Sequence, residues 1–265
     1  MAQVLHGDCL ELMKDIPDRS IDMVLTSPPY DKLRSYNGSL EWGDHVWKPV
    51  ISELFRVVKK GAVVVWVVAD ATINGSETGT SFRQALYAKE VGFNLHDTMI
   101  WEKPTFTATG SLSVRYASVF EYMFVFSKGS PKTFNPIKDR ITKGIRKKHG
   151  SVRQADGSTK KQSSIGKIYS GQLAQRFNVW KILPELSNLN RFHPAQFSVS
   201  LANDHIISWT NEGDVVLDPF AGSGTTAIAA LNTGRNYILM EKEAEYIEVI
   251  HKRIASHAVQ LQLAV

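Results

Sequence analysis

The stretch that decides the fold is Val215-Val216-Leu217-Asp218-Pro219-Phe220-Ala221-Gly222-Ser223-Gly224-Thr225-Thr226. It contains an apolar run that predicts a buried strand, a tight turn with Gly222 and Gly224, and the beginning of a helix. The two glycines allow a ligand to approach the backbone closely at a helix N-terminus. About 17 residues further on, a strand over residues 237–240 ends at Glu241, whose carboxylate can accept hydrogen bonds from ribose hydroxyls. Together these features predict a nucleoside cofactor in a Rossmann-like crevice.

Outward from this stretch, short apolar runs alternate with helical patterns along the chain. Repeated alternation of strand and helix predicts an α/β fold with a doubly wound, mostly parallel sheet. The fully apolar run at residues 62–69 suits a strand that is covered on both faces. The expected strands are residues 3–7, 21–26, 62–69, 94–101, 118–126, 215–218 and 237–241, and the expected helices are residues 9–16, 46–58, 81–91, 196–209, 224–232 and 243–258.

A second turn, Ser27-Pro28-Pro29-Tyr30, follows the apolar run at residues 21–26. Two prolines end a strand and hold the chain extended, and the carboxyl edge of an open α/β sheet is where ligands bind. Pro29 has no N–H, so nothing local needs the carbonyl of Pro28, while Ser27 adds a hydroxyl oxygen and Tyr30 a flat ring. Two acceptors beside an aromatic ring suit a planar group with an exocyclic NH₂. The alternative is a rigid turn in which Tyr30 only fills the core.

The formal net charge of +5 is unevenly distributed along the chain. Residues 129–178 contain twelve Lys or Arg and two acids, so this segment carries +10 and the rest of the chain −5. The segment is rich in Lys, Gly and Ser and shows no sustained period, which predicts an inserted lobe or a mobile loop. A basic block on an acidic body suggests a polyanionic partner, first of all nucleic acid; a solvated surface loop is the alternative.

Composition excludes several other classes of protein. A hydrophobic fraction of 43% and a charged fraction of 22% argue against collagen-like, disordered and coiled-coil chains. The single cysteine, Cys9, cannot form an internal disulfide, and the first residues lack a signal-type pattern, so we expect a protein of the reducing cytosol. No apolar run approaches the roughly 18 residues of a membrane span. The histidines show no metal-site spacing and no P-loop motif occurs, so we expect neither a metal site nor a nucleotide hydrolase.

Taken together, residues 26–30 and 218–226 resemble the two signature motifs of S-adenosylmethionine-dependent DNA amino-methyltransferases, which methylate cytosine N4 or adenine N6. The resemblance covers nearly the whole chain. The order of the motifs, with the Ser-Pro-Pro-Tyr turn first, the basic segment next and the cofactor turn last, is similar to the circularly permuted β arrangement of that family. It implies one Rossmann-like methyltransferase core, formed by residues 1–128 and 191–265, with a basic target-recognition insertion at residues 129–190.

The resemblance also implies roles for individual residues. Ser27, Pro28, Pro29 and Tyr30 would be catalytic: the Ser27 oxygen and the Pro28 carbonyl would accept hydrogen bonds from the NH₂ of a flipped-out base, and Tyr30 would stack on that base. The implied cofactor-binding residues are Asp8, Cys9, Ser27, His193, Pro194, Asp218, Phe220, Ala221, Gly222, Ser223, Gly224, Thr225, Glu241 and Lys242. The implied DNA-binding residues are Lys138, Arg140, Lys143, Arg146, Lys147, Lys148, Arg153, Lys160 and Lys161. Double-stranded DNA is the expected partner, and a cognate restriction endonuclease and a homodimer are compatible with the resemblance.

The target base and the class of activity leave alternatives open. Within the resembling family, Ser at the first motif position is commoner in cytosine enzymes and Asp or Asn in adenine enzymes, so Ser27 favours cytosine N4, with adenine N6 as the alternative. A nicotinamide-dependent oxidoreductase would leave the Ser-Pro-Pro-Tyr turn unused, and a non-enzymatic nucleic-acid-binding module would leave both turns unused. Protein-glutamine methyltransferases also use a Pro-Pro-Tyr turn to bind an amide NH₂. They normally carry Asn at the first position of that motif and have the cofactor motif before the catalytic one, and this chain has neither feature. Tyr36, Trp42 and Asp70 are further candidates that could line the site or only pack.

Overall fold

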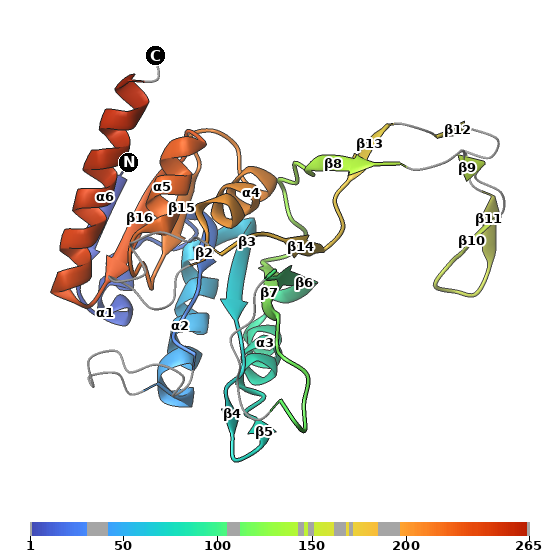
Figure 1. Ribbon diagram of the computed structural model, residues 1–265, viewed down its shortest axis with the longest axis horizontal. Coiled ribbons are helices and arrows are strands. Elements are labelled where there is room, and N and C mark those ends of the chain that lie inside the picture. The colour runs from blue at the N-terminus through green and yellow to red at the C-terminus, as the bar shows by residue number, and fades with distance from the viewer. Residues whose placement is uncertain are drawn as a thin grey trace. The chain divides into compact units, whose positions relative to one another are not determined.

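In the computed structural model (Figure 1), the chain is described at residues 2–30, 42–104, 112–142, 146–147, 151–161, 168–169, 172–184 and 197–263. It divides into two compact units. The larger unit consists of Met1–Asn135 and Asn178–Val265, and the smaller unit is Pro136–Phe177. No helix in the described part of the chain is long and apolar enough to cross a membrane.

Within the described residues, the larger unit contains a sheet of eight strands. Strand β7 runs antiparallel to both of its neighbours, and the remaining pairs are parallel. The sheet confirms the predicted mostly parallel α/β architecture. In spatial order the strands are β1 (Ala2–His6), β16 (Asn236–Glu241), β15 (Val215–Asp218), β2 (Ile21–Thr26), β3 (Val58–Val68), β7 (Phe120–Ser127), β6 (Asn94–Glu102) and β14 (Val179–Lys181).

Helices cover both faces of this sheet (Figure 1). One layer consists of α1 (Cys9–Met13), α2 (Asp44–Val57) and α3 (Thr80–Val91), and the other consists of α4 (Val199–Trp209), α5 (Thr225–Asn232) and α6 (Ala244–Leu263). Alternate residues of β3 show why its sequence is apolar throughout. Val64, Trp66 and Val68 belong to the core cluster formed with α1, α2 and α3, while Val63 and Val65 are equally buried on the opposite face.

The predicted elements of the larger unit are present, with shifted ends. The helix expected from residue 196 begins at Val199, because Ser198 is its N-cap and accepts a hydrogen bond from the Leu201 N–H. Gly61 was expected before the strand at residues 62–69, but it lies inside β3 as part of an irregularity in the β2–β3 register, with a φ of +86°. Two features were not predicted: strand β14, and the short hairpin of β4 (Thr72–Ile73) and β5 (Ser76–Glu77).

The smaller unit is built from short antiparallel strand pairs and is shorter than the predicted insertion at residues 129–190. An ion pair between Arg176 and Asp139 links the segments of its first pair, with Arg176 Nε 2.8 Å from Asp139 Oδ2. This ion pair lowers the pKa of Asp139. The pairs are β8 (Lys138–Ile141) with β13 (Leu173–Gln175), β9 (Arg146–Lys147) with β12 (Ile168–Tyr169), and β10 (Ser151–Arg153) with β11 (Thr159–Lys161).

Candidate active site

The two turns singled out in the sequence follow neighbouring parallel strands. The Ser-Pro-Pro-Tyr turn (residues 26–30) follows β2, and the glycine turn (residues 218–226) follows β15. The next strand after β2 in the chain, β3, lies on one side of this pair, and the next strand after β15, β16, lies on the other. Such a reversal of strand order leaves a crevice at the carboxyl ends of the strands, where open α/β sheets bind ligands. The fold therefore brings together two segments that are almost 200 residues apart.

Asp218 joins the two turns at the ends of their strands. Its Oδ1 accepts hydrogen bonds from Thr26 Oγ1 at 2.7 Å and from the backbone N–H of Phe220 at 3.1 Å, and its Oδ2 accepts one from Thr226 Oγ1 at 2.6 Å. Burial raises the pKa of Asp218 to about 6, although the three donors favour the ionised form. Because both of its oxygens are engaged within the protein, Asp218 fixes the positions of the turns.

Helix α6 packs against the glycine turn and forms hydrogen bonds with it. Gly222 and Gly224 adopt φ values of +50° and +80°, which residues with a side chain rarely adopt. Arg253 of α6 donates hydrogen bonds to both the backbone oxygen and the hydroxyl of Ser223, each at 2.8 Å. Ile250, from the same helix, packs so closely on Gly224 that a Cβ there would lie 3.0 Å from Ile250 Cγ1. The turn is therefore shaped by its own glycines and by the packing of α6.

Glu241 ends strand β16 beside the glycine turn. Its Oε2 accepts a hydrogen bond from the Gly222 N–H at 2.8 Å, and its Oε1 accepts one from the Glu243 N–H at 2.9 Å. The residue is 8% exposed, and burial raises the pKa of its carboxyl group. Each carboxylate oxygen carries two lone pairs, so Glu241 is fixed in place and can still accept hydrogen bonds from a ligand.

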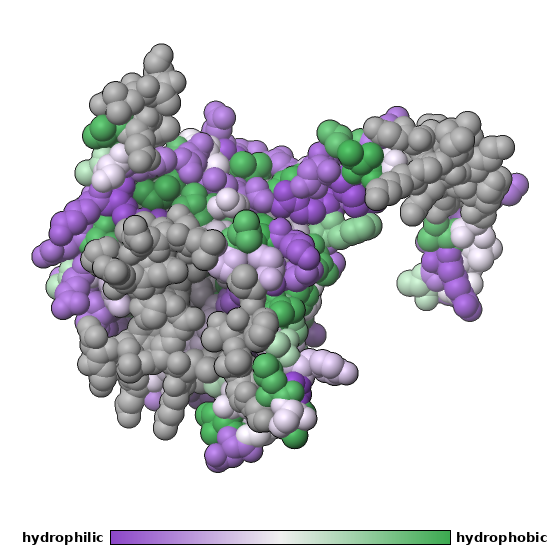
Figure 2. All heavy atoms as spheres, in the orientation of Figure 1, coloured by the Kyte–Doolittle hydropathy of each residue, from purple (hydrophilic) through white to green (hydrophobic). Residues whose placement is uncertain are grey.

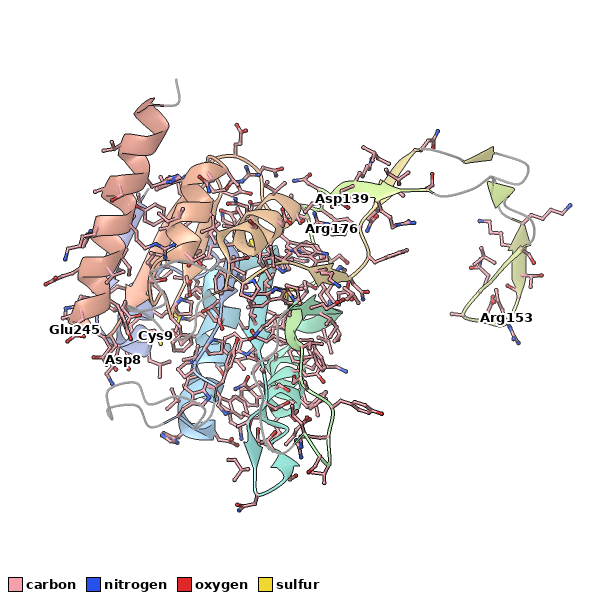
Figure 3. The ribbon with its side chains drawn as sticks, in the orientation of Figure 1. Asp8, Cys9, Asp139, Arg153, Arg176 and Glu245 are labelled. Atoms are coloured by element: carbon pink, nitrogen blue, oxygen red, sulfur yellow. The ribbon has the colours of Figure 1, made fainter. Side chains whose placement is uncertain are left out.

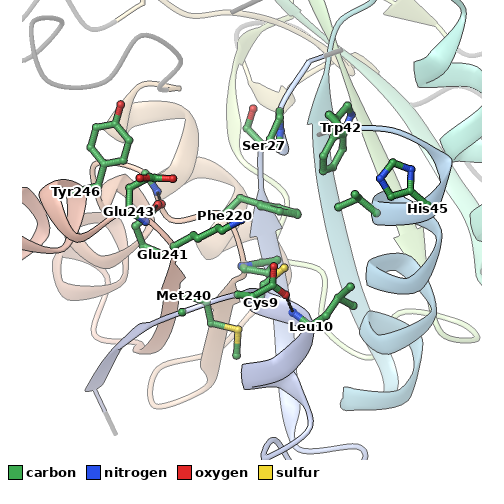
Figure 4. A pocket seen from close by; sticks show the side chains of 17 residues that line it. Cys9, Leu10, Ser27, Trp42, His45, Phe220, Met240, Glu241, Glu243 and Tyr246 are labelled. Atoms are coloured by element: carbon green, nitrogen blue, oxygen red, sulfur yellow. Dashed lines mark hydrogen bonds between the residues drawn. The ribbon is translucent and has the colours of Figure 1, made fainter. Parts of the chain in front are cut away.

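A cavity of about 370 Å³ opens between the two turns (Figure 4). In the figure, Glu241, Glu243 and Tyr246 lie across the cavity from Trp42 and His45. Trp42 and Phe220 meet edge to face with their ring centres 5.7 Å apart, which gives one part of the wall an aromatic surface. The lining residues are Gly7, Asp8, Cys9, Leu10, Ser27, Pro29, Trp42, His45, Val46, Pro219, Phe220, Gly222, Met240, Glu241, Lys242, Glu243 and Tyr246.

The Ser-Pro-Pro-Tyr turn carries a chain of hydrogen bonds that leads away from the cavity. Ser27 Oγ lies 2.8 Å from the Tyr30 hydroxyl, which donates to Glu121 Oε2 at 2.8 Å. The other oxygen of Glu121 pairs with the ammonium group of Lys103. That ammonium group also lies 4.9 Å from the ring centre of Trp101, in a cation–π position. Ser27 therefore stands at the cavity end of a polar chain that ends in a largely buried ion pair.

The predicted cofactor residues fall into three groups. Those that line the cavity are Asp8, Cys9, Ser27, Phe220, Gly222, Glu241 and Lys242. Those that are buried within the glycine turn, and are not among the lining residues, are Asp218, Ala221, Ser223, Gly224 and Thr225. His193 and Pro194 lie outside the described residues.

Two predicted candidates have structural roles that are evident in their contacts. Asp8 is the N-cap of α1 and accepts a hydrogen bond from the Leu10 N–H at 2.9 Å. Asp70 accepts hydrogen bonds from Ser81 N–H at 2.9 Å and Ser81 Oγ at 2.5 Å, and thus fixes the first turn of α3. Burial raises the pKa of the Cys9 thiol to about 12, which favours the protonated thiol at neutral pH.

Sequence reasoning missed several residues of the site. Glu243 and Tyr246 line the cavity, and their proximity to Glu241 in the chain was a usable signal. Glu121 and Lys103 were not singled out, because the sheet brings them to the site: β7 places Glu121 near Tyr30 by pairing with β3, the neighbour of β2, and β6 places Lys103 near Glu121 by pairing with β7. Tyr36, the other aromatic candidate of the loop, lies outside the described residues. Among the described residues, no group of three or more His, Cys, Asp or Glu is arranged to hold a metal ion.

In the smaller unit, the predicted DNA-binding residues differ in how they are engaged. Arg140 is committed to internal contacts, because its guanidinium lies 4.1 Å from the Phe177 ring centre and donates to the Gln175 carbonyl. Figure 3 shows Arg153 on the β10–β11 hairpin. Exposed side chains are those of Lys138, Arg153, Lys160 and Lys161; only the backbone of Arg146 and Lys147 is described, and Lys143 and Lys148 lie outside the described residues.

The visible surface of β8 and β13 is largely hydrophilic in Figure 2, with a small hydrophobic patch. Ile141 and Leu173, which pair across these strands, are 63% and 60% exposed. The described part of this unit therefore presents mainly polar and basic groups, together with the exposed apolar side chains of Ile141, Val152, Leu173 and Phe177.

The chain is similar to known proteins over most of its length. The family described as DNA methylase matches residues 21–252. The orphan methyltransferase M.BamHII of Bacillus amyloliquefaciens is 46% identical over 256 residues, which are 94% of each chain. The DNA adenine methyltransferase YhdJ of Escherichia coli (strain K12) is 29% identical over 276 residues, covering 98% of this chain and 86% of YhdJ. The solved structure of the PvuII DNA methyltransferase (cytosine-N4-specific) has the same fold, with a TM-score of 0.69 at 23% identity over 94% of this chain and 84% of that one.

Proposed function

We propose a mechanism for the site of this chain. The chain belongs to the DNA methylase family and is a DNA methyltransferase of the cytosine-N4 or adenine-N6 class. Its methyl donor is S-adenosylmethionine. In our proposal the cavity binds this donor, and the Ser-Pro-Pro-Tyr turn presents the amino group of a flipped-out base to it. The observation that carries the proposal is that Ser27, which follows strand β2, and Glu241, which ends strand β16, line the same cavity.

The residues of the cavity fit S-adenosylmethionine. A volume of about 370 Å³ lies within the range of small-molecule sites, about 300–1,000 Å³. The buried carboxylate of Glu241 has lone pairs for the ribose hydroxyls, and the aromatic wall of Trp42 and Phe220 suits the adenine ring. When bound, the donor supplies a methyl group that is activated by its positive sulfonium. The residues of the chain then have to hold and orient the two reactants.

Orientation of the amino group is the task we assign to the Ser-Pro-Pro-Tyr turn. The exocyclic nitrogen is a poor nucleophile because its lone pair is delocalised into the ring. Hydrogen bonds from its NH₂ to Ser27 Oγ and the Pro28 carbonyl would favour a pyramidal nitrogen aimed at the methyl group, and orientation of this kind can supply much of the rate acceleration. The ring of Tyr30 is 9% exposed and belongs to the core cluster, so in our proposal the flipped base enters beside it and stacks on it, which contributes about 1–3 kcal/mol. The new nitrogen cation loses its proton readily, so no strong base is needed.

For the target base we propose cytosine N4, on the strength of Ser27 at the first motif position. The alternative, adenine N6, is supported by the name of YhdJ, which is called an adenine methyltransferase. The PvuII enzyme, called cytosine-N4-specific, supports only the shared fold, since its identity with this chain is 23%. Analysis of the methylated nucleoside decides between the two bases.

For DNA recognition we propose the smaller unit, and within it one face of the β10–β11 hairpin. Ser151 pairs with Lys161 and Arg153 pairs with Thr159, so the side chains of Arg153 and Lys161 lie on the same face of this two-stranded ladder. Val152 and Lys160 lie on the other face. A face with two exposed cations suits the phosphates of double-stranded DNA, because neutralised phosphates release counterions.

The test is methyl transfer from tritiated S-adenosylmethionine to plasmid DNA, followed by mass spectrometry of the nucleosides. We expect label in DNA as N4-methylcytosine. The Ser27→Ala variant should transfer methyl groups about 100-fold more slowly, the loss typical for a group that contacts the reacting centre. Ser76→Ala, on the exposed β5 strand, is the matched control and should behave like the wild type. Unlabelled DNA across varied sequences, or an S27A variant of full activity, would contradict the proposal.

Further partners are proposed from the resemblance alone. They are a restriction endonuclease of the same site specificity and a second copy of this chain, acting in the cytoplasm of a bacterial or phage-infected cell. Sedimentation of the purified protein with and without DNA tests the dimer, since a single species of monomer mass at all concentrations would exclude it.

A further inference from the structure

We infer that Glu121 is a positioning residue for methyl transfer. Held by Lys103, it orients the hydroxyl of Tyr30 and, through it, the hydroxyl of Ser27, so that the Ser27 oxygen meets the target amino group as an acceptor. The inference rests on the proposed function and extends it to two residues that lie in neither turn.

The direction of the hydrogen-bond chain follows from what each group can donate. An ionised carboxylate has no proton, so Glu121 accepts from the hydroxyl of Tyr30 at 2.8 Å. A phenol hydroxyl has one proton, and Tyr30 donates it in the hydrogen bond to Glu121. The contact of 2.8 Å between Tyr30 and Ser27 must then be donated by Ser27. With its proton turned towards Tyr30, the Ser27 oxygen keeps both lone pairs for the cavity side.

The position of Glu121 is set by neighbouring strands and by Lys103. Glu121 lies on β7 opposite Trp101 of β6, and Lys103 follows directly after β6. Their side chains are 9% and 26% exposed, respectively. In a site that excludes most water, an ion pair is stronger than at the surface, and breaking it by removing one charge is costly. The pair therefore holds an acceptor oxygen of Glu121 next to Tyr30.

The direction of the chain matters for the reaction. An exocyclic amino group has two N–H donors, and the turn favours catalysis only if it offers acceptors to them. If Tyr30 donated to Ser27, the proton of Ser27 would be directed towards the amino group and two donors would face each other. Glu121 excludes this arrangement because it accepts the hydrogen bond that the Tyr30 hydroxyl can donate.

The Glu121→Gln variant should reverse the chain without changing the shape of the side chain. Lys103 can only donate, so the amide oxygen of the variant would turn towards Lys103 and its NH₂ group towards Tyr30. Tyr30 would then accept from the amide and donate to Ser27. We expect the rate of a single turnover, measured by rapid quenching with tritiated S-adenosylmethionine, to fall about 100-fold. The Kd for S-adenosylmethionine should stay within about twofold, because Glu121 is not among the residues that line the cavity.

Two double variants separate orientation from structural damage. In Lys103→Met with Glu121→Gln, the amide can rotate so that its oxygen faces Tyr30, and the single-turnover rate should recover at least about tenfold over E121Q. In a Tyr30→Phe background the chain is already cut, so E121Q should cause no further loss beyond about twofold. Glu102→Gln is the matched control: Glu102 pairs with Lys181 at 2.8 Å at the protein surface, and its variant should equal the wild type.

The outcomes are distinguishable. A wild type that transfers no methyl group to any DNA removes the proposed function, and this inference falls with it. A wild type that is active, with E121Q within about twofold of it, overturns the inference alone. The same holds if the K103M substitution deepens the loss of E121Q, because that result would indicate damage to the packing of β6 and β7.

Discussion

The Gly224→Ala substitution tests whether helix α6 shapes the glycine turn. Gly224 is the N-cap of α5 and has a φ of +80°. An added Cβ would lie 3.0 Å from Ile250 Cγ1 and 3.2 Å from Ile250 Cγ2. Ile250 is fully buried, so it has little room to move away. The substitution therefore imposes both a strained backbone and a steric overlap.

The two contributions can be estimated separately. A left-handed backbone costs a residue with a Cβ roughly 1–2 kcal/mol, and forcing an extra carbon into a packed core costs about 1–3 kcal/mol. We expect a total loss of about 2–5 kcal/mol in the free energy of unfolding. Gly213→Ala is the control, because Gly213 has a φ of +83° and its Cβ would have nothing within 4 Å. That control should lose only the backbone contribution, roughly 1–2 kcal/mol.

Urea unfolding of both variants, followed by tryptophan fluorescence, measures the difference between them. The double variant G224A with Ile250→Ala removes the two overlapping carbons, so its loss should be smaller than the sum of the single losses by about 1 kcal/mol or more. Equal losses for G224A and G213A would refute the reasoning, because the contact with Ile250 would then contribute nothing to the shape of the turn.

Three further predictions concern charges. Burial raises the pKa of Asp218 from 3.8 to about 6, so folding disfavours the ionised carboxylate. The protonated carboxyl group therefore stabilises the folded state below about pH 4, and this stabilisation is lost as the pH rises through about 6. Relative to wild type, Asp218→Asn should therefore gain up to ~3 kcal/mol between pH 4 and pH 7.5 in urea titrations, and a constant difference would disprove the charge penalty. Glu241→Gln should weaken S-adenosylmethionine binding about 10-fold or more in calorimetry, because its NH₂ would face a backbone N–H and cannot accept from a ribose hydroxyl; an unchanged Kd would remove Glu241 from the site. Alanine at Arg153 and Lys161 should lower the salt dependence of DNA binding by about 1 in the logarithmic slope for each residue, with less effect at Lys160 on the other face of the hairpin; equal slopes for all three would count against a single DNA-contacting face.

Local patterns were sufficient to predict most of the larger unit. At the Ser-Pro-Pro-Tyr turn and at the glycine turn, an apolar run predicts the strand and the Pro or Gly residues that follow predict the turn. The apolar run of β3 reflects burial on both faces of the sheet. Gly61 shows the limit of such reasoning. A glycine between a helical pattern and an apolar run indicates a boundary, but here it lies inside β3, where its φ of +86° and the nearby side chain of Lys132 leave no room for a Cβ. Strand β14 is too short to show a pattern and exists only through its pairing with β6.

What the sequence could not supply is the set of partners that hold the site from a distance. Asp218 was predicted to contact the cofactor because it stands in the right motif. In the structure its two oxygens bind Thr26, Thr226 and the Phe220 N–H, and the same carboxylate thus connects both turns. The spacing between Ser27 and the glycine turn is then set by the β2–β15 pair and not by either turn alone. A substitution at Asp218 should consequently alter the rate of methyl transfer and the binding of the donor together, whereas one at Glu121 should alter the rate alone.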